Sequence, residues 1–433
     1  MPLVFVALLV ASCDKLKGGS GAGYEMEAFG FQSEEDGKWG IMDMDGNVIV
    51  KPKFEGSITA VINGSFSVYD EEESEYTLYS LVDNKPKKIG KYRDVGGFTG
   101  NLCPAFDEDC NAKYIDKEGK TVLDLKKING KRVVAAFNFF CGRAMVKLEN
   151  EKWGYINEKG ETVIPFKYAD AWNFSDDVAI VFLQLPDEPN AKWMVIDKDG
   201  NELFTKKFKD MSPNDYKFSG GYLVVNDKND NHCIIDKKGE VVMKLKEDMH
   251  LIDVPRNGLF VVYNNDKEQT GLMDLEGNWV LKEKYESVAY NGKLLAASTD
   301  DEKYILFSTK GEKLGRLPRG GVILLEPEFK NCGDRMLVGS YEDGFKLLDG
   351  EGKKIDTAED ILQYSLLNYW GTSCEGEEEY YEDYDEEDDD PDAAFRLSEA
   401  HGLYGHACVA QHGGCCKICL QAAGAFSCKD RML

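Results

Sequence analysis

Lys152-Trp153-Gly154-Tyr155-Ile156-Asn157-Glu158-Lys159-Gly160-Glu161-Thr162-Val163-Ile164-Pro165 is the stretch of sequence that decides the fold. Apolar and polar residues alternate on both sides of Asn157-Glu158-Lys159-Gly160, and a period of two is typical of half-buried β-strands. An acid or amide at the first turn position and glycine at the fourth suit a tight turn, because the side chain bonds nearby backbone amides and glycine tolerates positive φ. The stretch therefore predicts a β-hairpin.

The hairpin recurs along the chain. Between residues 24 and 360 a unit of roughly 34 to 41 residues repeats, and its most regular part is an apolar residue, an acid, two free positions and a glycine. One such unit cannot bury its own apolar face, so the fold belongs to the array. A degenerate ninth copy is Leu81-Val82-Asp83. The eight regular copies are Met42-Asp43-x-x-Gly46, Ile115-Asp116-x-x-Gly119, Ile156-Asn157-x-x-Gly160, Ile196-Asp197-x-x-Gly200, Ile235-Asp236-x-x-Gly239, Met273-Asp274-x-x-Gly277, Phe307-Ser308-x-x-Gly311 and Leu348-Asp349-x-x-Gly352.

An aromatic position precedes most of these turns. We interpret it as a ladder of core side chains through which neighbouring units pack, in preference to a row of ligand-stacking rings, because its flanks place it among apolar residues. The residues at this position are Trp39, Trp153, Trp193, Tyr304 and Phe345, with Ala112, His232 and Thr270 in the weaker copies.

Lys38-Trp39-Gly40 and Lys152-Trp153-Gly154, each followed by the turn and a Val-Ile strand, resemble the WG-repeat family of bacterial proteins. Lys51-Pro52-Lys53-Phe54 and Pro165-Phe166-Lys167-Tyr168 fit the close of that repeat, and the stretch from Phe139 to Val146 fits its beginning. The resemblance covers about three quarters of the chain. It implies a β-rich module, usually extracytoplasmic or directed to interactions, and it implies no catalytic residue.

About eight to nine units of three or four short strands predict an all-β repeat array. We expect a closed β-propeller, since the unit length is near that of known blades and closure removes exposed strand edges. The alternative is an open β-solenoid with capped ends. The expected array covers residues 24–360.

The N-terminal run from Pro2 to Cys13 is apolar and ends in small residues. It is too short to span a bilayer and suits a secretory signal. Val10-Ala11-Ser12-Cys13 resembles the bacterial lipobox, although no Lys or Arg precedes the run. We expect a signal peptide over residues 1–12, lipid attachment at Cys13 and a Gly-rich flexible tether over residues 13–23. The alternative is a buried strand or a disordered stub.

The net charge of −26 is concentrated near the C-terminus, where 13 of the 18 residues from Glu375 to Asp392 are acidic. The rest of the chain lacks the basic stripe that binds phosphates, which excludes a nucleic-acid partner. We expect residues 361–392 to be an acidic, low-complexity, disordered linker. Loose cation binding is the alternative.

The tail, residues 393–433, is rich in cysteine and histidine, with Cys416-x-x-Cys419 at its centre. The spacing is compatible with a four-coordinate zinc site, whereas in an exported protein the same cysteines form disulfides. A third reading is an unstructured tail. Apart from this zinc, no cofactor is expected. The candidate ligands are His406, Cys408, His412, Cys416, Cys419 and Cys428.

The remaining chemistry-bearing residues of the body are scattered. Cys103 and Cys110 are near enough in sequence to pair, and the other body cysteines Cys141, Cys233 and Cys332 read mostly as buried small hydrophobes. His232 and His250 look isolated. Asp43-x-Asp45-Gly46-Asn47 and Asp197-x-Asp199-Gly200-Asn201 begin like calcium loops but lack the rest of that motif, so turn chemistry explains them. No hydrolase elbow, phosphate loop, dinucleotide fingerprint or zinc-protease motif is present.

The sequence thus favours a non-catalytic protein of the bacterial cell envelope. We expect it to be lipid-anchored, to face the periplasm or the exterior, and to bind or scaffold a protein or glycan through its array. One alternative is a metal-binding or thiol-redox protein that acts through the tail. A second is a propeller-type hydrolase, since acidic residues are plentiful.

Overall fold

A computed structural model describes residues 26–374 except 34, 185–191, 206–209, 212–216, 253–254, 300–302, 326–333, 341–343, 357–360 and 366–370. The regular elements of the described residues are all β-strands, as the alternation in the sequence predicts. In this part of the chain no helix is long and apolar enough to span a membrane.

The strands pair with their neighbours in chain order, so each unit is an antiparallel sheet that runs from an inner to an outer strand. The second to fifth units consist of β4 (Val61–Ile62), β5 (Ser65–Asp70), β6 (Glu75–Val82) and β7 (Lys85–Tyr92); β8 (Asp94–Val95), β9 (Cys103–Phe106), β10 (Ala112–Ile115) and β11 (Thr121–Asp124); β12 (Lys127–Ile128), β13 (Lys131–Phe140), β14 (Arg143–Leu148), β15 (Lys152–Ile156) and β16 (Thr162–Tyr168); and β17 (Asp170–Ala171), β18 (Val178–Phe182), β19 (Trp193–Asp197) and β20 (Glu202–Thr205).

The sixth to ninth units continue the same pattern, and the ninth has three strands. They consist of β21 (Asp210–Met211), β22 (Tyr222–Asn226), β23 (His232–Asp236) and β24 (Val241–Lys244); β25 (Met249–Leu251), β26 (Leu259–Asn264), β27 (Gln269–Asp274) and β28 (Trp279–Tyr285); β29 (Ser287–Tyr290), β30 (Leu295–Ser298), β31 (Tyr304–Phe307) and β32 (Lys313–Arg316); and β33 (Gly321–Leu324), β34 (Arg335–Ser340) and β35 (Gly344–Asp349).

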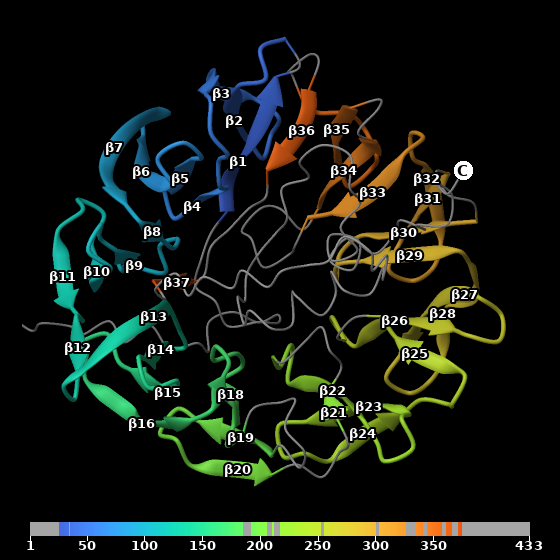
Figure 1. Ribbon diagram of the computed structural model, residues 1–433. Coiled ribbons are helices and arrows are strands. Elements are labelled where there is room, and N and C mark those ends of the chain that lie inside the picture. The colour runs from blue at the N-terminus through green and yellow to red at the C-terminus, as the bar shows by residue number, and fades with distance from the viewer. Residues whose placement is uncertain are drawn as a thin grey trace, which may run out of the picture.

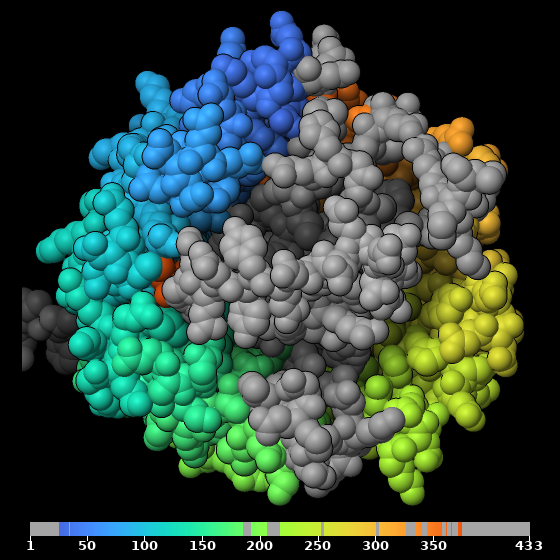
Figure 2. Space-filling model, viewed as in Figure 1, coloured from blue at the N-terminus to red at the C-terminus, as the bar shows by residue number. Residues whose placement is uncertain are grey.

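The first unit joins the two ends of the array. β1 (Met26–Ser33), β2 (Trp39–Asp43) and β3 (Val48–Phe54) come from the start of the chain, and the inner strand β36 (Ile361–Ser365) comes from its end. β36 pairs antiparallel with β1 in the register Phe31↔Tyr364. The described units therefore form a closed β-propeller, which Figure 1 shows as a ring and Figure 2 as units packed around one perimeter. The open-solenoid alternative is wrong.

The predicted end of the array at residue 360 is too early. β36 and a further strand, β37 (Gly371–Ser373), both lie within the segment expected to be a linker. β37 crosses to the fourth unit and pairs with β13. Their sequence carries no turn motif, because each strand completes a sheet made by distant residues rather than a unit of its own.

Burial follows position in the unit. The middle strand β15 is buried along almost its whole length, because other units cover both faces of its sheet, whereas the outer strand β16 alternates between buried and exposed residues. The core is accordingly divided into clusters between adjacent units. Trp39, Trp153 and Trp193 are all buried in these clusters. This confirms the interpretation of the aromatic position as a core ladder.

Candidate functional site

The turns that join the last two strands of the units, here called unit turns, share one hydrogen-bond pattern. Asp43 Oδ1 accepts the backbone N–H groups of Asp45 at 3.0 Å and Asn47 at 2.8 Å. This capping occupies the side chain and confirms turn chemistry as the reason for the acid. The described residues include no cluster of three or more His, Cys, Asp or Glu suited to a metal ion. The same pair of bonds forms at Asp116, Asn157, Asp197, Asp236, Asp274, Ser308 and Asp349.

The glycine of the unit turn packs against the preceding unit. Gly46, Gly119 and Gly239 all have positive φ, which favours glycine. A Cβ on Gly119 would lie 2.8 Å from the side chain of Ile89 on β7, and a Cβ on Gly239 would lie 2.9 Å from Phe204 on β20. A Cβ on Gly46 would lie 2.4 Å from the carbonyl oxygen of a residue just beyond β35, Ile355. The turn is thus also a contact between units.

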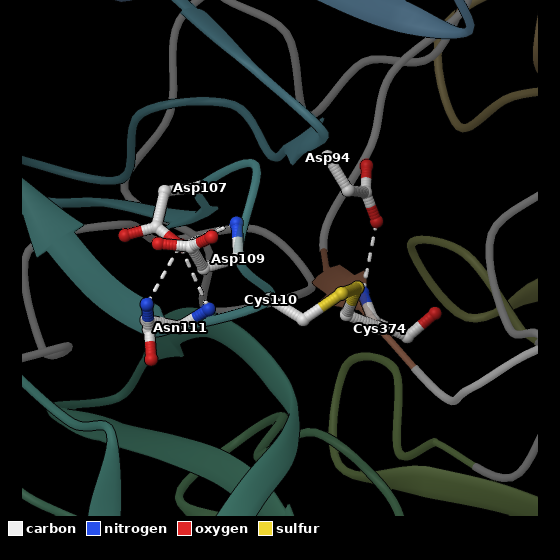
Figure 3. Close-up of a disulfide and its surroundings, with 7 residues drawn as sticks. Asp94, Asp107, Asp109, Cys110, Asn111 and Cys374 are labelled. Carbon is white, nitrogen blue, oxygen red and sulfur yellow. Dashed lines mark hydrogen bonds between the residues drawn. A yellow bond between two sulfur atoms is a disulfide. The ribbon is translucent and has the colours of Figure 1, made fainter.

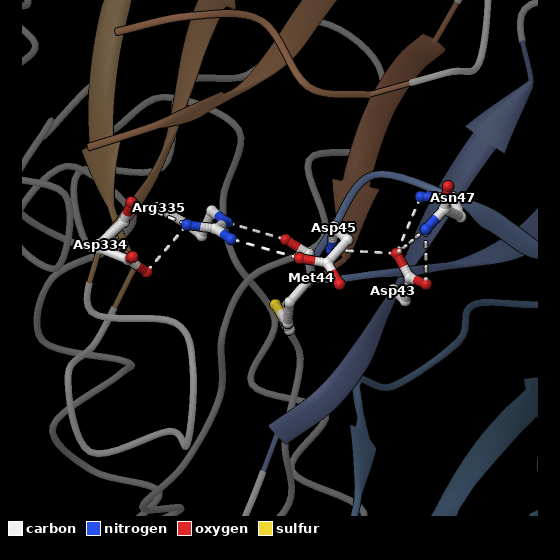
Figure 4. A network of polar contacts seen from close by, with 6 residues as sticks. All are labelled: Asp43, Met44, Asp45, Asn47, Asp334 and Arg335. Carbon is white, nitrogen blue, oxygen red and sulfur yellow. Dashed lines mark hydrogen bonds and ion pairs between the residues drawn. The ribbon is translucent and has the colours of Figure 1, made fainter. Parts of the chain in front are cut away.

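An arginine reinforces this contact where the ring closes. Arg335, the first residue of β34, donates from Nε to the carbonyl oxygen of Met44 at 2.9 Å, and its Nη2 lies 3.3 Å from the Asp45 carboxylate (Figure 4). Arg143, the first residue of β14, reaches the next unit turn in the same way, from Nε to the oxygen of Lys198 at 2.8 Å. The contact that closes the ring is therefore the one used between units in its interior.

A second closure lies at the third and fourth units. After β37, Cys374 forms a disulfide with Cys110 of the β9–β10 hairpin, with a Cα–Cα distance of 5.5 Å (Figure 3). Its backbone N–H donates to the Val134 oxygen at 2.9 Å. The predicted pairing of Cys103 with Cys110 is wrong, because Cys103 lies in β9 with its buried thiol 3.1 Å from the Gly96 oxygen. We take β37, the disulfide and their neighbours as the candidate site.

Asp94 of β8 connects this closure to the third unit. Its carboxylate is turned toward β37 and accepts the backbone N–H of Ser373 at 2.8 Å (Figure 3). Burial raises the pKa of the Asp94 carboxyl to about 6, and this effect outweighs the hydrogen bonds from the Ser373 and Val95 N–H groups, which lower the pKa. Burial, followed by the nearby Asp94, raises the pKa of the Cys103 thiol. A carboxyl group that titrates near neutrality thus holds the end of the described chain.

We expect the stability conferred by Asp94 to increase as the pH falls from about 6 to about 4. The folded protein binds this proton near pH 6, whereas the unfolded chain, with a pKa of 3.8, does not, so protonation favours the folded state. Asp94→Asn should remove this slope and raise the free energy of unfolding at pH 8 by at most about 3 kcal/mol. Urea denaturation between pH 4 and 8 measures both effects. Asp109→Asn, an exposed neighbour, is the control, and an identical slope in wild type and Asp94→Asn contradicts the prediction.

The prediction that His232 and His250 are isolated is wrong. The two side chains face each other between the sixth and seventh units. His232 Nδ1 accepts the Leu251 N–H at 3.1 Å, so its Nε2 carries the proton and faces His250 Nδ1 at 3.3 Å. On its other side, His250 Nε2 lies 2.6 Å from the side-chain amide nitrogen of Asn265. Burial, followed by the neighbouring His250, lowers the pKa of His232. Burial thus favours the neutral form of His232.

Two sets of predicted site residues cannot be placed. Cys13, the expected lipid attachment site, lies outside the described residues. So do the candidate zinc ligands His406, Cys408, His412, Cys416, Cys419 and Cys428. Cys332 also lies outside them, whereas Cys233 is a buried free thiol, as predicted, and Cys141 is partly buried.

The sequence did contain a signal for the disulfide. Cys110 follows Asp107-Glu108-Asp109 at the position where unit turns carry glycine, and its φ is 58°. Asp107 caps this turn as Asp43 does, through Asp109 and Asn111. A cysteine at a turn position that favours glycine indicates a separate role for its thiol. Its partner, 264 residues away, follows no repeat and was not identifiable.

Two segments, residues 39–64 and 153–183, match the family model described as "WG containing repeat". They contain the unit turns of the first and fourth units. No curated protein matches the chain in sequence.

Among solved structures, the chain is similar to one described as the crystal structure of "the eukaryotic initiation factor", at 13% identity, over 80% of this chain and 97% of that chain, with a TM-score of 0.51. BamB from Moraxella catarrhalis matches at 11% identity, over 69% of this chain and 92% of that chain, with a TM-score of 0.33. The dihydro-heme d1 dehydrogenase NirN in complex with DHE matches at 12% identity, over 80% and 74%, with a TM-score of 0.35. At this identity the first similarity indicates a shared fold alone.

Proposed function

We propose, from the premise that this chain is a WG-repeat protein folded as a β-propeller, that it is a non-catalytic, lipid-anchored protein of the bacterial cell envelope whose array binds or scaffolds a protein or glycan. The observation that carries the proposal is the Cys110–Cys374 disulfide. Structural disulfides persist in oxidising compartments and are rare in the cytosol. An exported location agrees with the apolar N-terminal run that ends at Cys13.

The contacts of the recurring turn residues support a scaffold rather than an enzyme. Asp43, Asp197 and Asp349 each cap their own turn, and Asp45 faces Arg335 of the neighbouring unit. The first three carboxylates are thus occupied by backbone N–H groups of their own turns, and the fourth is paired with an arginine across the seam. A ring stabilised at each seam presents its loops on a rigid frame, which favours binding by pre-organisation.

The test is expression of the full chain in a bacterium with a labelled fatty acid. We expect wild-type protein to incorporate the label, to sediment with membranes and to show an oxidised Cys110–Cys374 pair by thiol alkylation and mass spectrometry. Cys13→Ser should be unlabelled and released from membranes. Unlabelled wild-type protein with both thiols reduced contradicts the proposed location.

The binding part has its own test. Purified protein lacking residues 1–12 is screened against envelope proteins and a glycan array, with the Lys85→Gln variant, changed at an exposed residue, as a folded comparison. We expect one saturable ligand class retained by both proteins. Turnover of a glycan by the purified protein would instead favour the hydrolase alternative.

A further inference from the structure

The hairpin of residues 126–132, called the basic hairpin below, gathers cations in an otherwise acidic protein. It carries Lys126, Lys127, Lys131 and Arg132, and the three lysines are exposed. Ile128 on its other side is buried. The turn is tight, because Asn129 and Gly130 both have positive φ. The hairpin therefore presents its charge to the outside while its apolar residue fixes it to the fourth unit.

These cations have no ion-pair partner among the described residues, although two acids lie close by. Asp124 accepts the backbone N–H of Lys126 through Oδ1, and Glu149 donates its own backbone N–H to the Arg132 oxygen. By contrast, Lys113 and Lys147 nearby are paired with Asp107 and Glu151. In a chain of net charge −26, an exposed cluster of unpaired cations is suited to an acidic partner.

The described chain ends against this hairpin. Cys374 is 3% exposed and packs in one apolar cluster with Ile128 and Val133. β37 pairs antiparallel with β13 in the register Ala135↔Ser373, and the Cys374 N–H bonds the Val134 oxygen. This register directs the chain at Cys374 along β13 toward Arg132. The disulfide to Cys110 holds the direction in place.

We propose that the basic hairpin binds the chain's own acidic segment, residues 375–392. Its first acid, Glu375, follows Cys374 directly, and 13 of its 18 residues are acidic. A tether that begins beside the binding surface makes the contact intramolecular, with a high effective concentration. Exposed ion pairs are individually weak, so the contact relies on several charges and on the tether, and it is screened by salt.

The experiment is zero-length carbodiimide cross-linking of the full, oxidised chain, followed by mass spectrometry. We expect cross-links from carboxylates of residues 375–392 to Lys126, Lys127 and Lys131, and about tenfold fewer to Lys85, Lys87 and Lys88, which are equally exposed on β7. In 0.5 M NaCl the preference should disappear, since the Debye length is then only about 4 Å. Even labelling of both lysine sets at low salt overturns the proposal.

A protease that cleaves after glutamate gives an independent readout. Cleavage within residues 375–392 should be about tenfold faster in the Lys126→Gln/Lys127→Gln/Lys131→Gln variant than in wild type, and unchanged in the matched Lys85→Gln/Lys87→Gln/Lys88→Gln variant. Thermal unfolding of both variants checks that the ring is intact. Equal cleavage rates overturn the proposal. Cross-links found only between isotopically distinct copies overturn the proposal in favour of a second copy of the chain. Cross-links found only when another acidic macromolecule is added overturn it in favour of that macromolecule.

Discussion

Replacing Gly46 by alanine is expected to lower the free energy of unfolding by about 2–5 kcal/mol. Gly46 has a φ of +81°, where a Cβ costs about 1–2 kcal/mol. The added Cβ would also lie 2.4 Å from the Ile355 oxygen and 2.6 Å from the Asp356 Cα. These are backbone atoms that cannot rotate away, so the seam between the ninth and first units must open or shift.

Gly142→Ala is the matched control for this prediction. Gly142 has a φ of +75°, and a Cβ there would meet nothing within 4 Å, so this variant carries the conformational cost alone. Urea denaturation measures the loss in each variant, and hydrogen exchange should show faster exchange in β1 and β36 for Gly46→Ala only. Equal losses of unfolding free energy in the two variants would mean that the unit turn does not pack tightly against the preceding unit.

Removing the disulfide is expected to have the second large effect. Cys110 and Cys374 are 264 residues apart, and closing so long a loop restricts the unfolded chain by up to about 5 kcal/mol in the loop-entropy model. Cys374→Ala should therefore lose about 2–5 kcal/mol, and β37 should exchange its amide protons faster than β36.

Reduction provides the internal comparison. Wild-type protein in reductant should fall to the stability of Cys110→Ala, while Cys110→Ala itself should not respond. Cys103→Ala, which removes a buried free thiol from the same neighbourhood, should retain the response to reductant. A wild type indifferent to reductant would show that the pairing with β13 and Asp94 suffices to hold the C-terminal strand.

The unit itself was predictable because its information is local. Alternating residues flank Asn157-Glu158-Lys159-Gly160, and the structure places β15 and β16 on the two sides of that turn. The degenerate copy at Asp83 is also explained locally. There β6 and β7 are joined by Asp83 and Asn84, both at positive φ, which is the two-residue hairpin that requires no glycine.

The partners of each unit were not predictable in the same way. Cys110 pairs with Cys374 rather than with Cys103, because β37 pairs with β13 of the fourth unit, a contact that no local pattern encodes. His232 and His250 are 18 residues apart and face each other only because adjacent units stack. Asp94 looks like any surface acid in the sequence, and only its burial in the folded protein shifts its pKa toward 6, although the Ser373 N–H that it accepts lowers it in part.

The sequence by itself determined the repeating hairpin, its capped turn and the aromatic core position, since propensity, period and turn chemistry act over a few neighbouring residues. Tertiary structure alone decided that the ring closes through β36 on β1, that Gly46 lies against Ile355, and that Cys374 forms a disulfide beside the basic hairpin. Those outcomes depend on how small rotations between units add up around the array, and on which distant strand edges then meet.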